Sequence, residues 1–285
     1  MKKRLIAGLL VGAMAVSLSG CGASKTEEAP AAGDSAAEET AEAEPVTLNV
    51  FAAASMTETL TEIQEMYKDV APNVTLVFNF DSSGTLKTQI QEGADCDLFI
   101  SAAQKQMNQL DKDADPEVNT EGLDYVLEGT RVNLLENKVV LAVPDGNPKD
   151  IESFEDLGTD KLSLLALGNE DVPVGQYSTE ILTNLGILDS LEAEGKITYG
   201  SNVKEVTTQV SEAAVDAGII YATDAFSAGL TVVDQAEGDL CKQVIYPAAV
   251  LNISRNPEAA KEFLAYLQTD TCMQVFEAVG FTAAE

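Results

Sequence analysis

The chain has 285 residues with 17 basic and 47 acidic side chains, no histidine, and a formal net charge of −30. Binding to nucleic acid relies on clustered Lys and Arg that neutralise phosphates, so no nucleic-acid partner is expected. The lack of histidine excludes Ser-His-Asp and Cys-His catalysis and every zinc site with a histidine ligand. The nucleotide-binding patterns G-x-x-x-x-G-K and G-x-G-x-x-G and the nucleophile pattern G-x-S-x-G are absent from the sequence as well.

Residues 1–20 have the layout of a secretory signal peptide. Basic residues occupy positions 2–4, an apolar stretch too short to span a membrane covers 5–16, and small residues lead to Cys21. This ending resembles a bacterial lipobox, which implies that Cys21 becomes the lipidated first residue of the mature chain. The alternative is a simple signal peptide followed by an incidental cysteine.

Residues 22–45 consist mainly of Ala, Glu, Ser, Thr and Pro, with Lys25 as their one basic residue. Such a composition offers too little apolar surface to offset the entropy lost on ordering. We therefore expect 21–45 to be a lipidated cysteine with a disordered acidic tether. The protein would be extracytoplasmic and anchored to the cell membrane.

The first part of the chain after the tether alternates between strand-like and helix-like stretches. The apolar spacing predicts strands at 46–53, 74–80 and 97–101, each followed by a helix, at 57–70, 84–91 and 103–110. A β-α-β-α-β-α order favours a parallel sheet with helices on both faces.

The same pattern continues to the C-terminus. Strands are predicted at 138–144, 162–167, 197–200, 218–222, 231–233 and 244–253, and helices near 178–185, 203–214 and 224–228 and in the last 30 or so residues. About 240 residues suit two lobes better than one core. We expect an α/β fold of two lobes, each a mostly parallel sheet flanked by helices and joined by crossing strands near Lys138 and Tyr246. Lobe 1 would hold 46–137 and 247–285, and lobe 2 would hold 138–246.

Cysteines 96, 241 and 272 follow Cys21 in the chain. Because three is an odd number, at most one disulfide is expected among them. Their spacing is too wide for a C-x-x-C metal or redox site, so we expect small core residues.

Hydroxyl groups occur at three points where a predicted strand runs into a helix. Ser55 lies in FAAASMT, Ser83 in FDSSGT and Tyr221 in YATD. Ligands of doubly wound sheets bind at the carboxyl ends of strands, where helix N-termini offer unpaired N–H donors. The alternative interpretation makes the serines helix caps and Tyr221 a core residue with a satisfied hydroxyl.

Five segments together resemble the molybdate-binding proteins of ABC importers, in the same order and over nearly all of 46–285. They are FAAASMTETL, DSSGTLKTQIQEGADCDLFISA, DVPVGQYSTEIL, GIIYATDA and YPAAVL. The resemblance implies a two-lobed periplasmic-binding fold of the second type, which captures molybdate or tungstate in its cleft for a membrane permease.

The resemblance also implies a set of ligand-binding residues. Ser55 and Ser83 would donate hydroxyl and backbone hydrogen bonds, Val174 and Val203 backbone N–H groups from the second lobe, and Tyr221 its hydroxyl. A dianion with four acceptor oxygens suits such neutral donors, because no countercharge has to be desolvated. On this interpretation the protein is a monomer and not an enzyme, with no catalytic residue, no cofactor and no site for a bare metal cation.

Two features depart from the family pattern and leave alternatives open. Asn169-Glu170 stands where Asp-Pro is common, and Asp81 precedes the two serines where a small residue is common. We expect Asp81 to point away from the anion or to cap the helix. A carboxylate facing the ligand would instead repel molybdate and sulfate and could accept a proton from hydrogen phosphate. Another tetrahedral oxyanion such as sulfate or phosphate is the alternative ligand. A secreted enzyme or an interaction protein is the alternative of another class.

Overall fold

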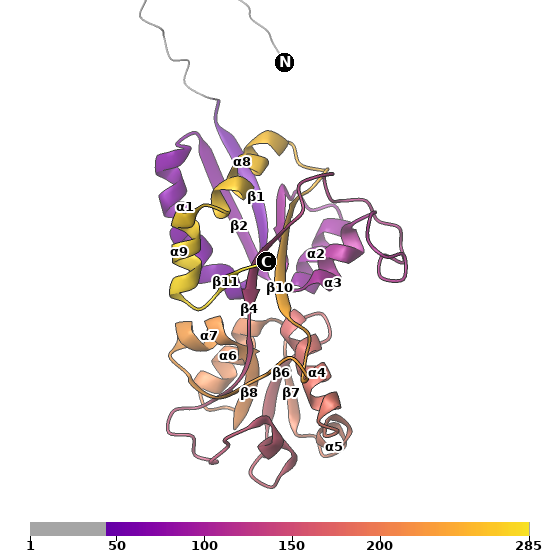
Figure 1. Ribbon diagram of the computed structural model, residues 1–285, viewed down its shortest axis with the longest axis vertical. Coiled ribbons are helices and arrows are strands. Elements are labelled where there is room, and N and C mark those ends of the chain that lie inside the picture. The colour runs from indigo at the N-terminus through magenta and orange to yellow at the C-terminus, as the bar shows by residue number, and fades with distance from the viewer. Residues whose placement is uncertain (1–43, 285) are drawn as a thin grey trace, which may run out of the picture. The chain divides into compact units, whose positions relative to one another are not determined.

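A computed structural model describes residues 44–284, so the predicted signal peptide, Cys21 and most of the predicted tether lie outside the described residues. The first sheet has the strand order β11-β4-β10-β3-β1-β2 (Figure 1). Its strands are β1 (Val46–Ala53), β2 (Val74–Asp81), β3 (Leu98–Ile100), β4 (Val132–Asn137), β10 (Val244–Val250) and β11 (Thr282–Ala283).

Helices cover both faces of the first sheet, with α1, α8 and α9 on one side and α2 and α3 on the other (Figure 1). Strand β1 shows why, because Val50 and Ala52 belong to one apolar cluster and Phe51 between them to the other. The helices are α1 (Thr57–Val70), α2 (Ser83–Gln91), α3 (Gln104–Leu110), α8 (Pro257–Leu267) and α9 (Asp270–Ala278), with the 3-10 turn η1 (Ala54–Met56) before α1.

The second sheet has the order β7-β6-β8-β5-β9. Its strands are β5 (Val139–Val143), β6 (Leu165–Gly168), β7 (Ile197–Gly200), β8 (Ala217–Tyr221) and β9 (Thr231–Gln235). The associated helices are α4 (Pro173–Asn184), α5 (Leu188–Ala193), α6 (Val203–Ser211) and α7 (Ala222–Ala228), with the 3-10 turn η2 (Phe154–Gly158) after β5. We call the first sheet with its helices lobe 1 and the second sheet with its helices lobe 2.

Both sheets are mixed, where mostly parallel sheets were expected. In lobe 1, β1 pairs in parallel with β2 and β3, whereas β10 and β11 pair antiparallel with their neighbours. In lobe 2, β6 pairs in parallel with β7 and β8, whereas β5 is antiparallel to β8 and β9. The four strands that flank the two passages between the lobes, β4, β5, β9 and β10, all take part in antiparallel pairs.

The chain passes between the lobes twice. The first passage lies at Lys138, between the end of β4 and the start of β5. The return lies between β9 and β10, and β10 pairs with β4 from Val244 onward. The boundary expected at Tyr246 therefore falls inside a lobe 1 strand, and the return occurs a few residues earlier in the chain.

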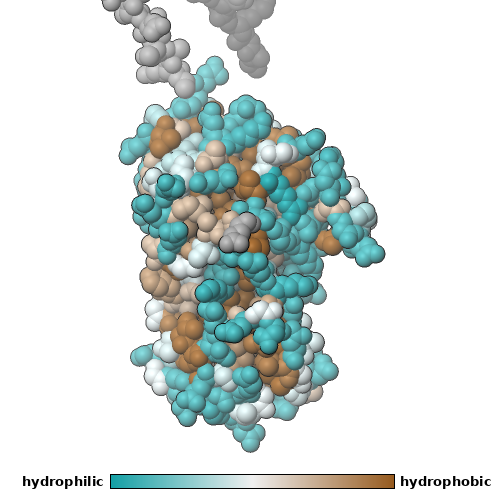
Figure 2. All heavy atoms as spheres, viewed as in Figure 1, coloured by the Kyte–Doolittle hydropathy of each residue, from teal (hydrophilic) through white to brown (hydrophobic). Residues whose placement is uncertain are grey.

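The three described cysteines, Cys96, Cys241 and Cys272, are free and buried. On the face shown in Figure 2, hydrophobic residues form separate spots among hydrophilic ones. Among the helices described within 44–284, none is long and apolar enough to cross a membrane.

Candidate functional site

A small cavity lies where the carboxyl ends of strands from both lobes meet. Its volume is about 10 Å³, room for roughly one water molecule. This is the edge at which α/β sheets bind ligands. The cavity is lined from lobe 1 by Ala53, Ala54, Ser55, Asp81, Ser82, Ser83 and Ala102, and from lobe 2 by Val172, Pro173, Val203 and Tyr221.

Two buried serine hydroxyls line the cavity from lobe 1. Ser55 lies in the turn η1, and its Oγ is 2.9 Å from Tyr246 Oη. Ser83 is the first residue of α2, and its Oγ accepts a hydrogen bond from the Ala102 N–H at 3.0 Å. Because that oxygen acts as an acceptor, the Ser83 hydroxyl keeps its own hydrogen for a further partner.

Neither serine caps a helix, which was the alternative interpretation from the sequence. The cap of α2 is Ser82, whose Oγ accepts the Thr85 N–H at 3.1 Å. The residue preceding α1 is Met56, which makes no side-chain cap. Capping therefore explains neither Ser55 nor Ser83.

Lobe 2 directs two helix N-termini toward the cavity. Val203 is the first residue of α6, and Val174 is the second residue of α4, directly after the cavity-lining Pro173. Within the described part of the chain, neither valine N–H has a hydrogen-bond acceptor. Such first-turn N–H groups, at the positive end of the helix dipole, bind anions. Val174 itself does not line the cavity.

Tyr221 is the last residue of β8 and is 1% exposed. Its Oη is 3.5 Å from the Ala102 carbonyl oxygen, the upper limit for a hydrogen bond. Burial raises the pKa of Tyr221 well above its ordinary value, so the phenol remains a donor. The alternative interpretation, that Tyr221 is a core residue whose hydroxyl is already hydrogen-bonded, thus depends on this one long contact with Ala102.

None of the residues lining the cavity is Lys or Arg, and Asp81 is the charged residue among them. Its Oδ1 accepts the Ser82 N–H at 2.7 Å and faces Asn202 Nδ2 of lobe 2 at 3.4 Å. Ser82 supplies the cap of α2, so the expectation that Asp81 caps the helix was wrong. The Asp81 carboxylate faces Asn202, which does not line the cavity.

Three residues that were not predicted as site residues connect the cavity to the first passage between the lobes. Tyr246 Oη contacts Ser55 Oγ and lies 3.1 Å from Asn137 Nδ2, which is also 2.9 Å from Thr223 Oγ1 in lobe 2. All of these side chains are buried. The signal in the sequence was a polar Asn next to the predicted crossing at Lys138 and the Tyr of YPAAVL.

Direct contacts join the two lobes around the cavity. The Gly84 N–H of lobe 1 donates to the Asp171 carbonyl of lobe 2 at 3.1 Å. Lys204 of α6 forms an ion pair with Glu58 of α1 at 2.7 Å. The structure is therefore a closed form of the cleft.

Lys204 also approaches Asp224, a carboxylate buried in lobe 2. The Lys204 Nζ to Asp224 Oδ1 distance of 3.1 Å is that of an ion pair, and among the described residues neither Asp224 oxygen has a further hydrogen-bond partner. Burial raises the pKa of Asp224 to about 6, and the lysine opposes this shift only in part.

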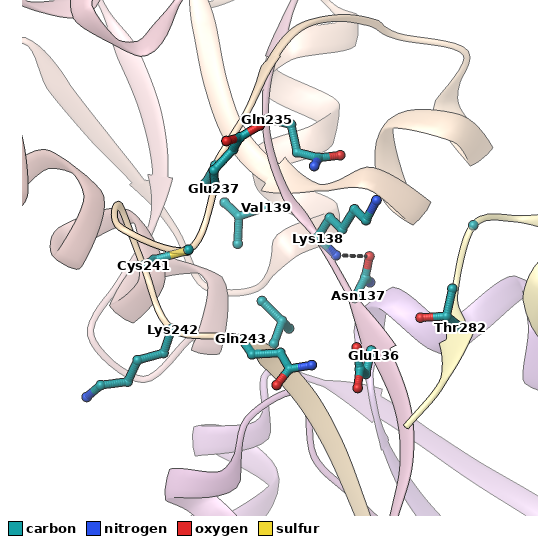
Figure 3. A pocket seen from close by; sticks show the side chains of 14 residues that line it. Glu136, Asn137, Lys138, Val139, Gln235, Glu237, Cys241, Lys242, Gln243 and Thr282 are labelled. Carbon is teal, nitrogen blue, oxygen red and sulfur yellow. Dashed lines mark hydrogen bonds between the residues drawn. The ribbon is translucent and has the colours of Figure 1, made fainter. Parts of the chain in front are cut away.

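A second cavity, of about 540 Å³, lies beside the two passages between the lobes. Figure 3 shows side chains of both charges around it, among them Glu136, Lys138, Glu237 and Lys242. None of the five predicted anion-binding residues lines it. Among residues 44–284, no group of three or more His, Cys, Asp or Glu residues could hold a metal ion.

Residues 48–282 match the family model described as bacterial extracellular solute-binding protein. The chain belongs to this family. Its two lobes and the cavity between their strand ends are thus those of an extracellular solute-binding protein.

Named relatives in this family include transport proteins. The chain is 38% identical over 84% of its length to Bacillus subtilis YvgL, whose name assigns it provisionally to the ABC transporter substrate-binding lipoproteins, and covers 87% of that protein. It is 34% identical over 83% of its length to the molybdate-binding protein ModA of Haemophilus influenzae, covering 90% of it. A Clostridium difficile substrate-binding domain ascribed to a molybdenum ABC transporter superposes with a TM-score of 0.63 at 36% identity, over 84% of this chain and 100% of that one.

Proposed function

We propose that this protein captures molybdate or tungstate in the cleft between its lobes and delivers the anion to an ABC permease. The observation that carries the proposal is the convergence of neutral donors from both lobes on one cavity without Lys or Arg. Ser55, Ser83 and Tyr221 would supply hydroxyls, and Val174 and Val203 would supply backbone N–H groups. The named molybdate-binding relatives support the same ligand.

The donors suit a fully deprotonated tetrahedral anion. Molybdate offers four acceptor oxygens and has no proton to donate, so each donor finds an acceptor. Hydrogen bonds to a charged partner contribute about 1.5–3 kcal/mol each. Donors from both lobes would hold the cleft shut, and the closed cleft would present the surface that a permease recognises.

Isothermal titration calorimetry of residues 44–285 against molybdate, tungstate, sulfate and phosphate tests the ligand. We expect one-to-one binding of molybdate or tungstate and little response to sulfate. Binding of hydrogen phosphate in preference to molybdate would make Asp81, in the cavity wall, the acceptor of the phosphate proton and would move the function to phosphate capture.

The serines are tested by Ser55→Ala and Ser83→Ala. Each change removes a hydroxyl donor to a charged ligand, so each should weaken molybdate binding by about 10- to 100-fold. Ser211→Ala is the matched control, because its exposed hydroxyl bonds only to the Thr208 carbonyl of α6. Affinities within about twofold of wild type, roughly 0.4 kcal/mol, would contradict the proposed site.

We further propose that the mature chain is a monomer that begins at a lipidated Cys21 and is held at the outer face of the cell membrane by its tether. YvgL, a relative named as a lipoprotein, supports this arrangement. Metabolic labelling with a fatty acid and membrane fractionation should show a labelled, membrane-bound protein. A Cys21→Ala variant that still incorporates the label would contradict it. Light scattering of the purified domain measures the oligomeric state.

A further inference from the structure

A chain of hydrogen bonds, part-buried at Lys138 and buried beyond it, leads from the first passage between the lobes to the candidate anion site. It joins Lys138, Asn137, Tyr246 and Ser55 in that order. Tyr246 is 0% exposed and Asn137 7%. Because buried polar groups are costly to leave unpaired, the direction of each bond can be worked out from the donors present.

The orientation of the Asn137 amide is fixed first. The Lys138 backbone N–H donates to Asn137 Oδ1 at 2.8 Å, the bond drawn as a dashed line in Figure 3. The amide oxygen is therefore committed to that side. The two Nδ2 hydrogens then point to Tyr246 Oη at 3.1 Å and Thr223 Oγ1 at 2.9 Å.

The direction of the Tyr246 hydroxyl follows. Its oxygen already accepts from Asn137, and Ser55 Oγ, 2.9 Å away, is the hydrogen-bond partner left for its hydrogen among the described residues. The reverse arrangement, with Ser55 donating to Tyr246, would leave the buried tyrosine hydrogen without an acceptor. Tyr246 therefore donates to Ser55, and the Ser55 hydrogen is left to point elsewhere.

We propose that Asn137 and Tyr246 are positioning residues that fix the Ser55 hydroxyl as a hydrogen-bond donor to the bound anion, a role that rests on the proposed function. The relay from Asn137 through Tyr246 to Ser55 favours an anion whose oxygens only accept. Asn137 also donates to Thr223 of lobe 2, so the relay contacts both lobes.

Tyr246→Phe tests the relay, because it removes the hydroxyl and keeps the ring. A released Ser55 hydroxyl has three staggered positions, so molybdate affinity should fall at least about threefold, with a further loss because the relay no longer polarises the serine. Tyr67→Phe is the matched control, since Tyr67 is a buried tyrosine of α1 without a hydrogen bond from its hydroxyl to a described residue. An unchanged affinity of Tyr246→Phe would overturn the relay.

A double-mutant cycle separates positioning from a general effect on the fold. If Tyr246 acts through Ser55, the Ser55→Ala/Tyr246→Phe variant binds molybdate no more weakly than Ser55→Ala alone. If the loss of affinity in the double variant equals the product of the two single losses, Tyr246 does not act through Ser55 and the relay is wrong. Asn137→Ala, which removes the donor to Tyr246 and keeps the tyrosine, should likewise weaken binding only in the presence of Ser55.

The relay and the proposed ligand can fail separately. If the wild-type protein binds sulfate and not molybdate, the proposed function is wrong, and the same cycle measured with sulfate decides on the relay by the same criteria. If none of the four anions binds, the cycle is measured on urea unfolding without ligand. The relay then requires non-additive effects of Ser55→Ala and Tyr246→Phe, and additive effects would overturn it.

Discussion

Asp81 is the charged residue among the otherwise neutral residues that line the cavity. The Ser82 N–H and Asn202 Nδ2 satisfy its Oδ1 and hold the side chain between the lobes. An anion in the cavity would be repelled by this charge, and little water would remain to screen the repulsion in a closed cleft. The negative charge of Asp81 should therefore lower the affinity of the proposed site for a dianion.

Replacing Asp81 by Asn should raise molybdate affinity. The amide oxygen can still accept the Ser82 N–H, while the formal charge disappears, so we expect a gain of about three- to tenfold, shrinking as salt is added. Calorimetry at low and high ionic strength measures both effects. Asp145→Asn, a change of the same kind at an exposed position outside the cavity, is the control. A loss of affinity in Asp81→Asn would mean that the carboxylate helps to hold the lobes together more than it repels the ligand.

The sequence predicted only part of the site at this scale. Ser55, Ser83 and Tyr221 could be found because they stand where a strand runs into a helix. Tyr246 and Asn137 were not predicted as site residues, because each lies within a strand and meets the site only through pairing of β10 with β4. Val174 and Val203 would bind through their backbone N–H groups and not through their side chains, so only the family resemblance predicted them.

Helix α6 shows how one element combines several contacts between and within the lobes. Its first residue, Val203, lines the cavity, and Lys204 pairs with Glu58 of lobe 1 and approaches Asp224 of lobe 2. Burial lowers the pKa of Lys204, but the carboxylates of Asp224 and Glu58 outweigh this effect and the pKa is raised. The lysine is therefore charged throughout the physiological range.

The raised pKa of Asp224 makes stability depend on pH in a definite direction. Its folded-state value of about 6 exceeds the ordinary value of 3.8, so the native state binds more protons than the unfolded state between these values. The free energy of unfolding should fall as pH rises through this window, by on the order of 2–3 kcal/mol from this group.

Urea unfolding of wild type and Asp224→Asn between about pH 4 and pH 7 measures this contribution. The difference in unfolding free energy, wild type minus variant, should decrease across the window and level off above it. Asp216→Asn is a useful comparison, because Asp216 likewise forms an ion pair with a lysine of lobe 2 and is only partly buried. A difference that stays constant with pH would show that Asp224 titrates near its ordinary value.

Elements with strong apolar periodicity were predicted closely. β1 and α1 have the predicted bounds, Val46–Ala53 and Thr57–Val70. β4 was not predicted, because its sequence VNLLEN mixes polar and apolar residues and is stabilised by pairing with β10. β10 was predicted to reach Ile253 but ends at Val250, since its partner β3 extends only over Leu98–Ile100.

Across the whole molecule, closure brings the backbone of one lobe against the other at Gly84. A Cβ at this position would overlap the Asp171 carbonyl oxygen of lobe 2. Glycine is needed here for close approach, because its φ is not one that disfavours other residues. The contact exists only when the lobes are together.

Gly84→Ala should therefore impair closure while leaving lobe 1 folded. We expect molybdate affinity to fall at least about tenfold, with unchanged or slightly increased stability of the ligand-free protein because Ala favours helices. Small-angle scattering should show wild type becoming more compact with molybdate, and the variant less so. Gly238→Ala, at a position with no atom near the added Cβ, is the control. Wild-type affinity in Gly84→Ala would contradict a role of this contact in closure.

The two lobes of the proposed site differ in how their contribution is encoded. The contributions of Ser55 and Ser83 in lobe 1, and of Tyr221 in lobe 2, depend on side-chain hydroxyls, which a single base change can remove. The N-termini of α4 and α6 offer backbone N–H groups at Val174 and Val203, which any residue except proline also carries. In related sequences, positions 174 and 203 can therefore drift in residue type while anion capture persists, and a proline at either would mark a protein that has lost or changed its ligand.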